Sequence, residues 1–155
     1  MTKTIPSQSS SLDDWLFYLE SVHPANIAMG LERVADVANN IGLLNTPSKI
    51  ILIGGTNGKG TTARCLESLL LAQGFSVGTY ASPHLIRYNE RVRINGSELD
   101  DQFHVDAFHQ LEQGRKDTQL TYFEYGTLGA LAIFKRFSVD YVLLEVGLGG
   151  RFDAT

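Results

Sequence analysis

The chain has 155 residues, of which 43% are hydrophobic, and a formal net charge of −4. This length fits about one ordinary domain with a real core, and the mild acidity argues against a nucleic-acid-binding surface. The single cysteine, Cys65, excludes an intrachain disulfide and favours a reducing compartment. Residues 1–11 are polar and contain no signal peptide, and no apolar run approaches the ~20 residues that span a bilayer. We therefore expect a cytoplasmic protein that binds neither nucleic acid nor membrane.

The first part of the chain predicts a tail followed by two helices. Residues 1–10 indicate a flexible N-terminus. A capping-box pattern at Ser11 and Asp14 then opens a helix that ends near Val22. Apolar residues recur at helical spacing over 31–41, which predicts a second helix before a short connector.

The stretch KIILIGGTNGKGTT at 49–62 has the layout of a phosphate-binding loop. An apolar strand at 50–53 breaks at glycines, and a helix is predicted over 59–73. The glycines let the backbone approach a phosphate, while loop N–H groups and the helix N-terminus supply partial positive charge. Lys59 adds a full charge for the outer phosphates, and Thr61 offers a hydroxyl to Mg²⁺.

The spacing of this loop departs from the common phosphate-loop motif. That motif would place its first glycine at position 53, where the sequence has Ile53. The alternative interpretation is a glycine-rich turn with a solvated lysine, and the strand context and the paired threonines count against it. The predicted nucleotide-binding residues are Gly55, Thr56, Asn57, Gly58, Lys59, Gly60, Thr61 and Thr62.

The rest of the chain alternates strands and helices. Residues 75–80 predict a second strand, parallel to the first, and residues 81–96 predict a long basic loop. Helices are expected over about 101–113 and 122–136, before an apolar strand over 139–146. The pattern predicts a phosphate-loop three-layer α/β/α fold with a mostly parallel sheet. Because only three strands are evident and sheets average about five to six, we expect the fold to be truncated.

The carboxyl ends of the three predicted strands should meet, which is where ligands bind in open α/β sheets. Glu145 ends the third strand, like the acidic residue that holds Mg²⁺ in phosphate-loop enzymes; the alternative is a carboxylate that caps a loop. Ser82 follows the second strand and is either a second metal ligand or a plain turn serine. Arg87, Arg91 and Arg93 form either a solvated face or a clamp for a carboxylate-bearing substrate.

Four stretches together resemble the folylpolyglutamate synthase/dihydrofolate synthase family, a branch of the Mur ligase superfamily. They are GTNGKGTT at 55–62, YASPHLIRYNERVRING at 80–96, TYFEYGTLGAL at 121–131 and LEVGLGGRFDAT at 144–155. Gly60 favours the folate branch, because Mur cell-wall ligases typically carry threonine at that position. The resemblance implies that residues 11–155 form the N-terminal portion of a Mur ligase-like ATP-binding domain, without its C-terminal domain.

The resemblance implies an ATP-dependent ligase that adds L-glutamate, through an acyl phosphate, to dihydropteroate or to the glutamate tail of reduced folates. ATP and Mg²⁺ are the implied cofactors, and a monomer is expected. Lys59 and Glu145 are the implied catalytic residues, and Thr61, Ser82 and Glu145 the implied metal residues. The implied pterin-binding residues are Ala28, Met29, Gly30, Leu31, Thr121, Tyr122, Phe123, Glu124, Phe152, Asp153 and Ala154.

One departure from the family, the lack of further family residues and two alternatives bear on this interpretation. Ala28 stands where the family often has an acidic residue, so any carboxylate contact to the pterin from that position is lost. A further histidine metal ligand and a carbamylated lysine are missing from the sequence, so we expect the chain alone to be inactive. A Mur-type cell-wall amino-acid ligase is disfavoured by Gly60 and the FEYGTL segment. A non-catalytic nucleotide-binding module is disfavoured by Glu145 and the arginine-rich loop.

Overall fold

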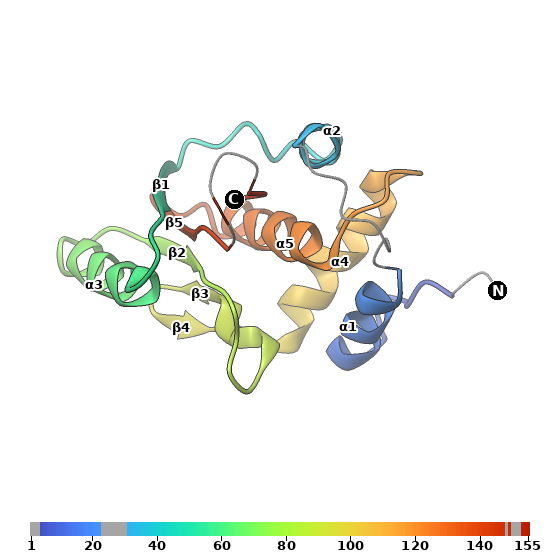
Figure 1. Ribbon diagram of the computed structural model, residues 1–155, viewed down its shortest axis with the longest axis horizontal. Helices are drawn as coiled ribbons and strands as arrows, with labels where there is room; N and C mark the ends of the chain where they lie inside the picture. The colour runs from blue at the N-terminus through green and yellow to red at the C-terminus, as the bar shows by residue number, and fades with distance from the viewer. Residues whose placement is uncertain (1–3, 23–30, 148, 150–152) are drawn as a thin grey trace. The chain divides into compact units, whose positions relative to one another are not determined.

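The structure is a computed structural model of the chain. It describes residues 4–22, 31–147, 149 and 153–155. The chain divides into two compact units (Figure 1): the first holds residues 1–45, 100–133 and 154, and the second holds residues 46–99, 134–153 and 155. Within the described ranges, no helix combines the length and the apolar character needed to cross a membrane.

The first unit is helical. Its helices are α1 (Leu12–Ser21), α2 (Glu32–Asn40), α4 (Asp101–Arg115) and the greater part of α5 (Tyr122–Phe137). The predicted capping box opens α1: the Asp14 N–H donates to Ser11 Oγ, and the Ser11 N–H donates to Asp14 Oδ2, both at 3.1 Å. The indole of Trp15 is fully buried, packs 6.2 Å from the ring of Phe108 in α4, and donates its N–H to the Ser7 carbonyl at 3.1 Å. Apolar packing and one indole hydrogen bond thus fix α1 and the segment before it on α4.

A buried polar cluster also joins three helices of this unit. The carboxylate of Glu112 in α4 accepts hydrogen bonds from Tyr18 Oη in α1 at 3.0 Å, from Arg115 Nε at 2.9 Å, and from Tyr125 Oη in α5. Burial, followed by the hydrogen bond to this carboxylate, raises the pKa of Tyr125 far above its ordinary value. Tyr125 is therefore a neutral donor at physiological pH, and the buried Glu112 charge has three partners.

The second unit is built on a five-stranded sheet of order β1-β5-β2-β3-β4. The strands are β1 (Lys49–Ile53), β2 (Val77–Tyr80), β3 (Val92–Ile94), β4 (Ser97–Glu98) and β5 (Tyr141–Glu145). β5 pairs in parallel with both β1 and β2, whereas β3 and β4 extend the sheet in antiparallel order. The predicted fold class, a phosphate-loop α/β fold with a parallel centre to its sheet, is confirmed.

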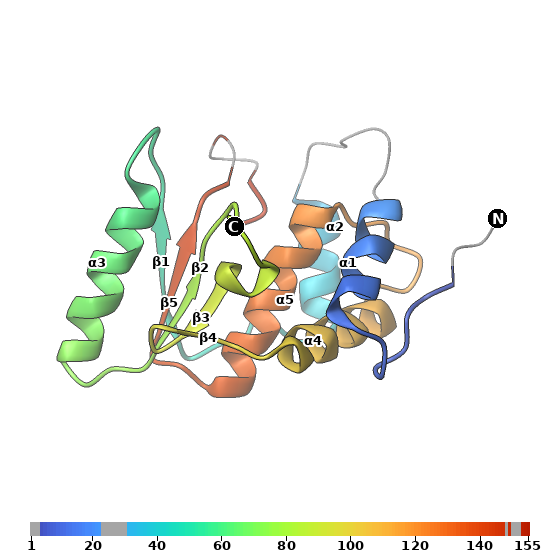
Figure 2. The ribbon, with the colours of Figure 1, turned by 90° about the horizontal axis from the view of Figure 1, so that it is seen from below.

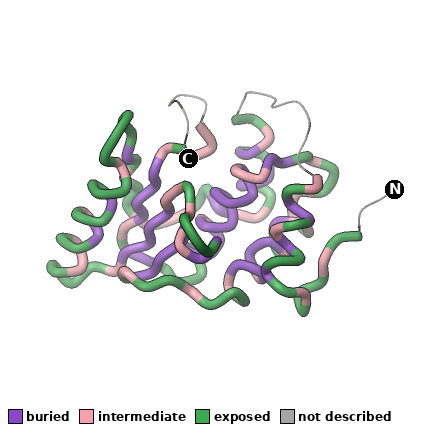
Figure 3. The backbone as a smooth tube through the Cα atoms, turned by 60° about the horizontal axis from the view of Figure 1, so that its bottom comes forward, coloured by how far each residue is buried: buried purple, intermediate pink, exposed green. Residues whose placement is uncertain are grey.

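Helical residues of the second unit pack on each face of this sheet. On one face, α3 (Lys59–Ala72) lies along the parallel strands, as Figure 2 shows. The core of this layer is the buried cluster of Ile53, Ala63, Val77 and Leu143. On the opposite face, Phe134 at the end of α5 lies so close to Gly78 that a Cβ on Gly78 would collide with its ring. The central strands between these layers are buried along most of their length (Figure 3).

The prediction of a long unstructured loop over 81–96 was wrong. This segment contains a 3₁₀ turn, η1 (Tyr88–Arg91), and strand β3, which turns into β4 through Asn95 and Gly96. These two residues have φ of 52° and 82°, as a two-residue hairpin turn requires. The Asn-Gly pair is the sequence signal for this hairpin, but Arg91 and Arg93, which precede it, gave the strand the composition of a polar loop.

The predicted parallel relation of the first two strands holds, but they are not neighbours. β5 lies between β1 and β2 and pairs with each of them. This insertion puts the end of β5 between the two loops that follow β1 and β2. It is the feature of the fold that assembles the candidate site.

Candidate functional site

The loop between β1 and α3 leaves backbone donors open at the start of a helix. Gly58 is the N-cap of α3 and has φ of 76°, in the left-handed region that favours glycine. It makes no side-chain cap to the first turn, and that turn contains no acidic residue. A Cβ built on Gly54 or Gly58 would meet nothing within 4 Å, so the space above the loop is open. Exposed N–H groups at the positive end of a 14-residue helix suit an anion such as a phosphate.

Two side chains of this loop donate hydrogen bonds to its own backbone, and the others are exposed. Lys59 Nζ donates to the Gly55 carbonyl at 3.1 Å, so the ammonium group folds back over the loop. Thr62 Oγ1 donates to the Gly58 carbonyl at 2.9 Å and braces the turn from within. Thr56, Asn57 and the other threonine of the pair are exposed. The predicted nucleotide-binding residues thus form one continuous loop, with Lys59 as its mobile positive charge.

Glu145 lies beside this loop, where β5 ends. It pairs in register with Ile53, and the Val146 N–H donates to the Ile53 carbonyl at 3.0 Å. A Cβ on Gly60 would lie 3.9 Å from Glu145 Oε2, which places the carboxylate against the first turn of α3. The residue is only 6% exposed, and no hydrogen-bond donor to its carboxylate is found in the described part of the chain. A buried carboxylate in this situation suits a bound cation.

Ser82 lies at the end of the next strand. Tyr80 pairs with Leu144, so Ala81 and Ser82 continue β2 past the level of Glu145. The Ala81 N–H donates to the Arg91 carbonyl at 2.9 Å, which ties the start of this loop to η1. The Ser82–Pro83 peptide is cis, and Ser82 is half-buried.

The oxygen donors of this corner fit Mg²⁺. A serine hydroxyl and a carboxylate are hard ligands, and Mg²⁺ is commonly held by one or two protein groups together with substrate phosphates and water. Over the described ranges, no group of three or more His, Cys, Asp or Glu side chains could hold a metal without such help. Ser82 and Glu145 stand at neighbouring strand ends, while Thr61 is exposed in the first turn of α3.

A carboxylate that the sequence analysis missed fixes the loop after Ser82. Glu90 in η1 accepts the backbone N–H groups of Leu85, Ile86 and Arg87 at 2.8, 2.8 and 2.7 Å. These three hydrogen bonds, led by that from Leu85, lower the pKa of Glu90 to about 2. The spacing of Arg87 and Glu90 is that of a capping box, which is the signal that could have revealed this contact.

The arginines of this segment are engaged inside the second unit. Arg93 is 7% exposed and donates from Nη2 to Glu67 at 3.0 Å, and Thr79 Oγ1 donates to the same carboxylate at 2.9 Å. Arg91 donates from Nε to His84 Nδ1 at 2.7 Å. The solvated-face interpretation is therefore wrong for both arginines, and the substrate-clamp interpretation loses its support at Arg93.

The start of α5, in the first unit, carries the other predicted site segment. The predicted capping box is present: the Glu124 N–H donates to Thr121 Oγ1 at 3.2 Å, and the Thr121 N–H donates to Glu124 Oε2 at 2.6 Å. Both residues are buried, whereas Tyr122 and Phe123 are half-buried. Arg33 in α2, which the sequence analysis missed, donates from Nη2 to Glu124 Oε1 at 2.9 Å.

The remaining predicted pterin residues are only partly covered by the structure. Leu31 is the N-cap of α2 and is 40% exposed. Asp153 Oδ1 accepts the backbone N–H of Thr155 at 2.9 Å, and Ala154 is half-buried. The other predicted positions lie outside the described residues; they are Ala28, Met29, Gly30 and Phe152.

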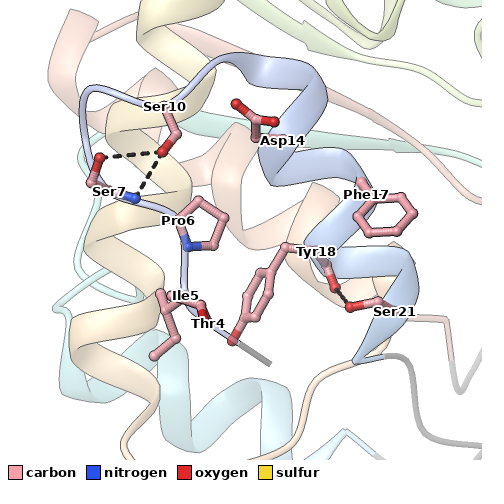
Figure 4. A pocket seen from close by; sticks show the side chains of 9 residues that line it. All are labelled: Thr4, Ile5, Pro6, Ser7, Ser10, Asp14, Phe17, Tyr18 and Ser21. Atoms are coloured by element: carbon pink, nitrogen blue, oxygen red, sulfur yellow. Dashed lines mark hydrogen bonds between the residues drawn. The ribbon is translucent and has the colours of Figure 1, made fainter. Parts of the chain in front are cut away.

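An open groove in the first unit contains none of the predicted site residues. It has a volume of about 690 Å³ and is formed by α1 and the segment that precedes it (Figure 4). The lining residues are Thr4, Ile5, Pro6, Ser7, Ser10, Asp14, Phe17, Tyr18 and Ser21. Its one carboxylate, that of Asp14, already belongs to the α1 capping box. The groove therefore lacks the groups that phosphate or metal chemistry needs.

Comparison with known proteins shows what this chain is similar to. No protein-family model matches the chain. The dihydrofolate synthase/folylpolyglutamate synthase of Escherichia coli (strain K12) is 54% identical over 153 residues, which are 99% of this chain and 36% of that protein. The structure of E. coli FolC in complex with DHPP and ADP superposes with a TM-score of 0.93 at 54% identity, over 97% of this chain and 36% of that one. These matches confirm the resemblance to the dihydrofolate synthase/folylpolyglutamate synthase family.

A second solved structure bears on the ligands of this family. The crystal structure of a bifunctional folylpolyglutamate synthase/dihydrofolate synthase with Mn, AMPPNP and L-glutamate bound has a TM-score of 0.92 at 55% identity. It is matched over 97% of this chain and 36% of its own. The chain spans about a third of the length of the curated relatives it matches, and it corresponds to their N-terminal part.

Proposed function

We propose that the full-length parent of this chain is an ATP-dependent ligase that adds L-glutamate to dihydropteroate, to the glutamate tail of reduced folates, or to both. The observation that carries this proposal is the meeting of the Lys59 loop, Ser82 and Glu145 at three neighbouring strand ends. Relatives of 54–55% identity that bind ADP or AMPPNP, Mn, DHPP and L-glutamate support it.

The second unit would hold the ATP phosphates. The open N–H groups at the start of α3 bind phosphate oxygens, and Lys59 leaves the Gly55 carbonyl to neutralise the outer phosphates. Ser82 and Glu145 would hold Mg²⁺, which supplies positive charge that stabilises the phosphates during transfer. Because Glu145 is buried and held in the sheet, it orients that charge without further ordering.

The proposed reaction proceeds in two steps, and the residues of this chain serve the first. An oxygen of the substrate carboxylate attacks the γ-phosphorus of ATP, the bond to the ADP oxygen breaks, and an acyl phosphate forms. Lys59 and the α3 N–H groups stabilise the negative charge that moves onto ADP. The glutamate amine then attacks the acyl carbon and loses a proton, and phosphate leaves with the electrons of its C–O bond.

The first unit would contribute to the pterin site. Leu31 and the turn at Thr121–Phe123 are the residues of this unit proposed for it, and Asp153 and Ala154 remain proposed from the family resemblance alone. We propose that the 155 residues alone do not ligate glutamate, because they span about a third of the length of their relatives.

Assay of the full-length parent tests this function. We expect ADP release that requires glutamate together with dihydropteroate or a tetrahydrofolate, and a product one glutamate longer by mass spectrometry. Turnover of a UDP-sugar peptide without any use of pterin substrates would instead assign a Mur-type cell-wall ligase. Tight ATP binding with no ligation of either substrate class would leave a nucleotide-binding module.

A further inference from the structure

The carboxylate of Glu124 is committed to protein partners. The residue is 6% exposed, its Oε2 accepts the Thr121 N–H at 2.6 Å, and its Oε1 accepts Arg33 Nη2 at 2.9 Å. Both oxygens thus point toward donors of the first unit. An amino group of a pterin would have to compete with a charged guanidinium and a helix-capping N–H for the same atoms.

The capping box at the start of α5 does not by itself require a cationic partner such as Arg33. The equivalent box at the start of α1, Ser11 with Asp14, is exposed, and among the described residues it has no cationic partner. At the start of α5 the acidic residue is buried and paired with Arg33, which comes from a different helix. A partly buried ion pair of this kind adds little net stability compared with apolar packing, and it holds the two groups that it joins at 2.9 Å.

The pair joins two segments proposed to contact the same ligand. Arg33 lies two residues after Leu31, the half-exposed N-cap of α2, and its side chain is 28% exposed. Glu124 lies one residue after Phe123, and Tyr122 and Phe123 are half-buried in the first turn of α5. A shift of Arg33 or Glu124 would therefore move the proposed pterin-contacting residues of α2 and α5 relative to each other.

We propose that Arg33 and Glu124 form a positioning pair that sets the pterin-binding turn at the start of α5 against the start of α2, and that Glu124 does not itself bind the pterin. This inference rests on the proposed function. It assigns a role to Arg33 and changes the role of Glu124 from a ligand residue to a support.

The pair is tested by a double-mutant cycle in the full-length parent. Arg33→Met keeps the aliphatic stem and removes the charge, while Glu124→Gln can still cap α5 but removes the negative charge of the ion pair. We expect each substitution to raise the KM for dihydropteroate or tetrahydrofolate about tenfold. The kcat and the KM for ATP should stay within about twofold of wild type. The double variant should be no worse than either single one, because both remove the same interaction.

Two further variants separate positioning from general stability. Arg33→Lys should restore much of the affinity for the pterin substrate, because it returns the positive charge. Asp14→Asn disrupts the matched capping box of α1 and should lower the melting temperature while leaving every KM unchanged.

Four outcomes would overturn the proposal. A large effect of Glu124→Gln with none from Arg33→Met would make Glu124 a direct ligand, and additive effects in the double variant would deny the coupling. A parallel loss for all substrates that tracks the melting temperature would indicate a purely structural pair. A wild-type parent that ligates glutamate to no pterin substrate would overturn the proposed function, and this inference with it.

Discussion

At the scale of single residues, the candidate site depends on a few charged groups whose burial differs sharply. Glu145 is buried at a strand end, Lys59 is half-buried over its own loop, and Glu90 is held by three backbone N–H groups. These three residues have different roles. Glu145 suits a bound cation, Lys59 suits a phosphate, and Glu90 fixes the conformation of the loop after Ser82. Lys59 and Glu90 each give a separate prediction.

Lys59 is expected to act in phosphoryl transfer and not in folding. Lys59→Met in the full-length parent removes a charge that holds the transferred phosphate, so the ligation rate should fall about 100-fold or more. Lys49→Met is the matched control, because Lys49 lies at the opposite end of β1 with its ammonium group over the Tyr141 ring at 5.3 Å. Initial rates of ADP release measure both. Equal losses for the two variants would contradict the role of Lys59.

Glu90 should make the second unit sensitive to acid. Its folded pKa, about 2, lies below its ordinary value of 4.5, so folding favours the ionised form. The resulting stability is present above pH 4.5 and is lost as pH falls toward 2. Glu90→Gln should lower the melting temperature at pH 7 and flatten its fall between pH 4.5 and 2. Glu98→Gln, which loses the exposed pair with Arg87, is the control and should change little. Thermal unfolding measured across this pH range tests the prediction. A melting temperature that falls as steeply in Glu90→Gln as in wild type between pH 4.5 and 2 would refute it.

At the scale of elements, close contacts and buried pairs determine how helices meet strands and one another. The Phe134 ring fills the space that a side chain on Gly78 would occupy. The carboxylate of Glu112 accepts hydrogen bonds from hydroxyl groups of two other helices. Neither contact can be predicted from the secondary-structure propensity of the local sequence. Both can be measured by substitutions that leave the elements themselves intact.

Gly78→Ala should destabilise the sheet because its Cβ would strike the Phe134 ring. A clash of this kind in a packed layer costs about 1–3 kcal/mol in the free energy of unfolding. Gly54→Ala is the matched control, because a Cβ there meets nothing within 4 Å. Combining Gly78→Ala with Phe134→Leu should recover part of the loss by making room. Urea unfolding gives the values, and equal stability of the two glycine variants would exclude the clash.

Tyr125→Phe should loosen the junction of α1, α4 and α5. It removes a donor to the buried Glu112 carboxylate, which costs about 1–3 kcal/mol. Because folding raises the pKa of Tyr125, its contribution is complete below the ordinary tyrosine value of 10.0 and is lost as pH rises above it. Tyr141→Phe is the control, because the Tyr141 hydroxyl accepts a hydrogen bond from the exposed Lys49 at 3.4 Å. Unfolding free energies are measured at pH 8 and pH 11. Equal losses relative to wild type in both variants would show that the Tyr125 hydrogen bond is not the source of the stability.

At the scale of the whole molecule, the sequence predicted what is local and missed what is paired over distance. The apolar runs of β1 and β5 and the glycine loop between β1 and α3 carry their own signals, so both strands and the loop were found. The insertion of β5 between β1 and β2 is a long-range pairing that no local pattern encodes. The burial of Arg93 was hidden for the same reason, since its partner Glu67 lies 26 positions away. Arg33 was overlooked because its partner Glu124 is 91 positions distant.

The final prediction concerns the chain as a whole. The second unit presents a complete phosphate loop and two metal-ligand candidates, so its phosphate-binding groups do not need the rest of a longer enzyme to be placed. Ligation also requires glutamate and pterin held in line with that phosphate, and the chain spans only about a third of the length of its relatives. We therefore expect the 155-residue chain to show no ATP-dependent glutamate ligation at enzyme concentrations where the full-length parent gives saturating product. Mass spectrometry of the pterin product tests this prediction. The Lys59→Met variant of the full-length parent is the inactive reference. Product formed by the short chain above that reference would show that these residues hold all three substrates.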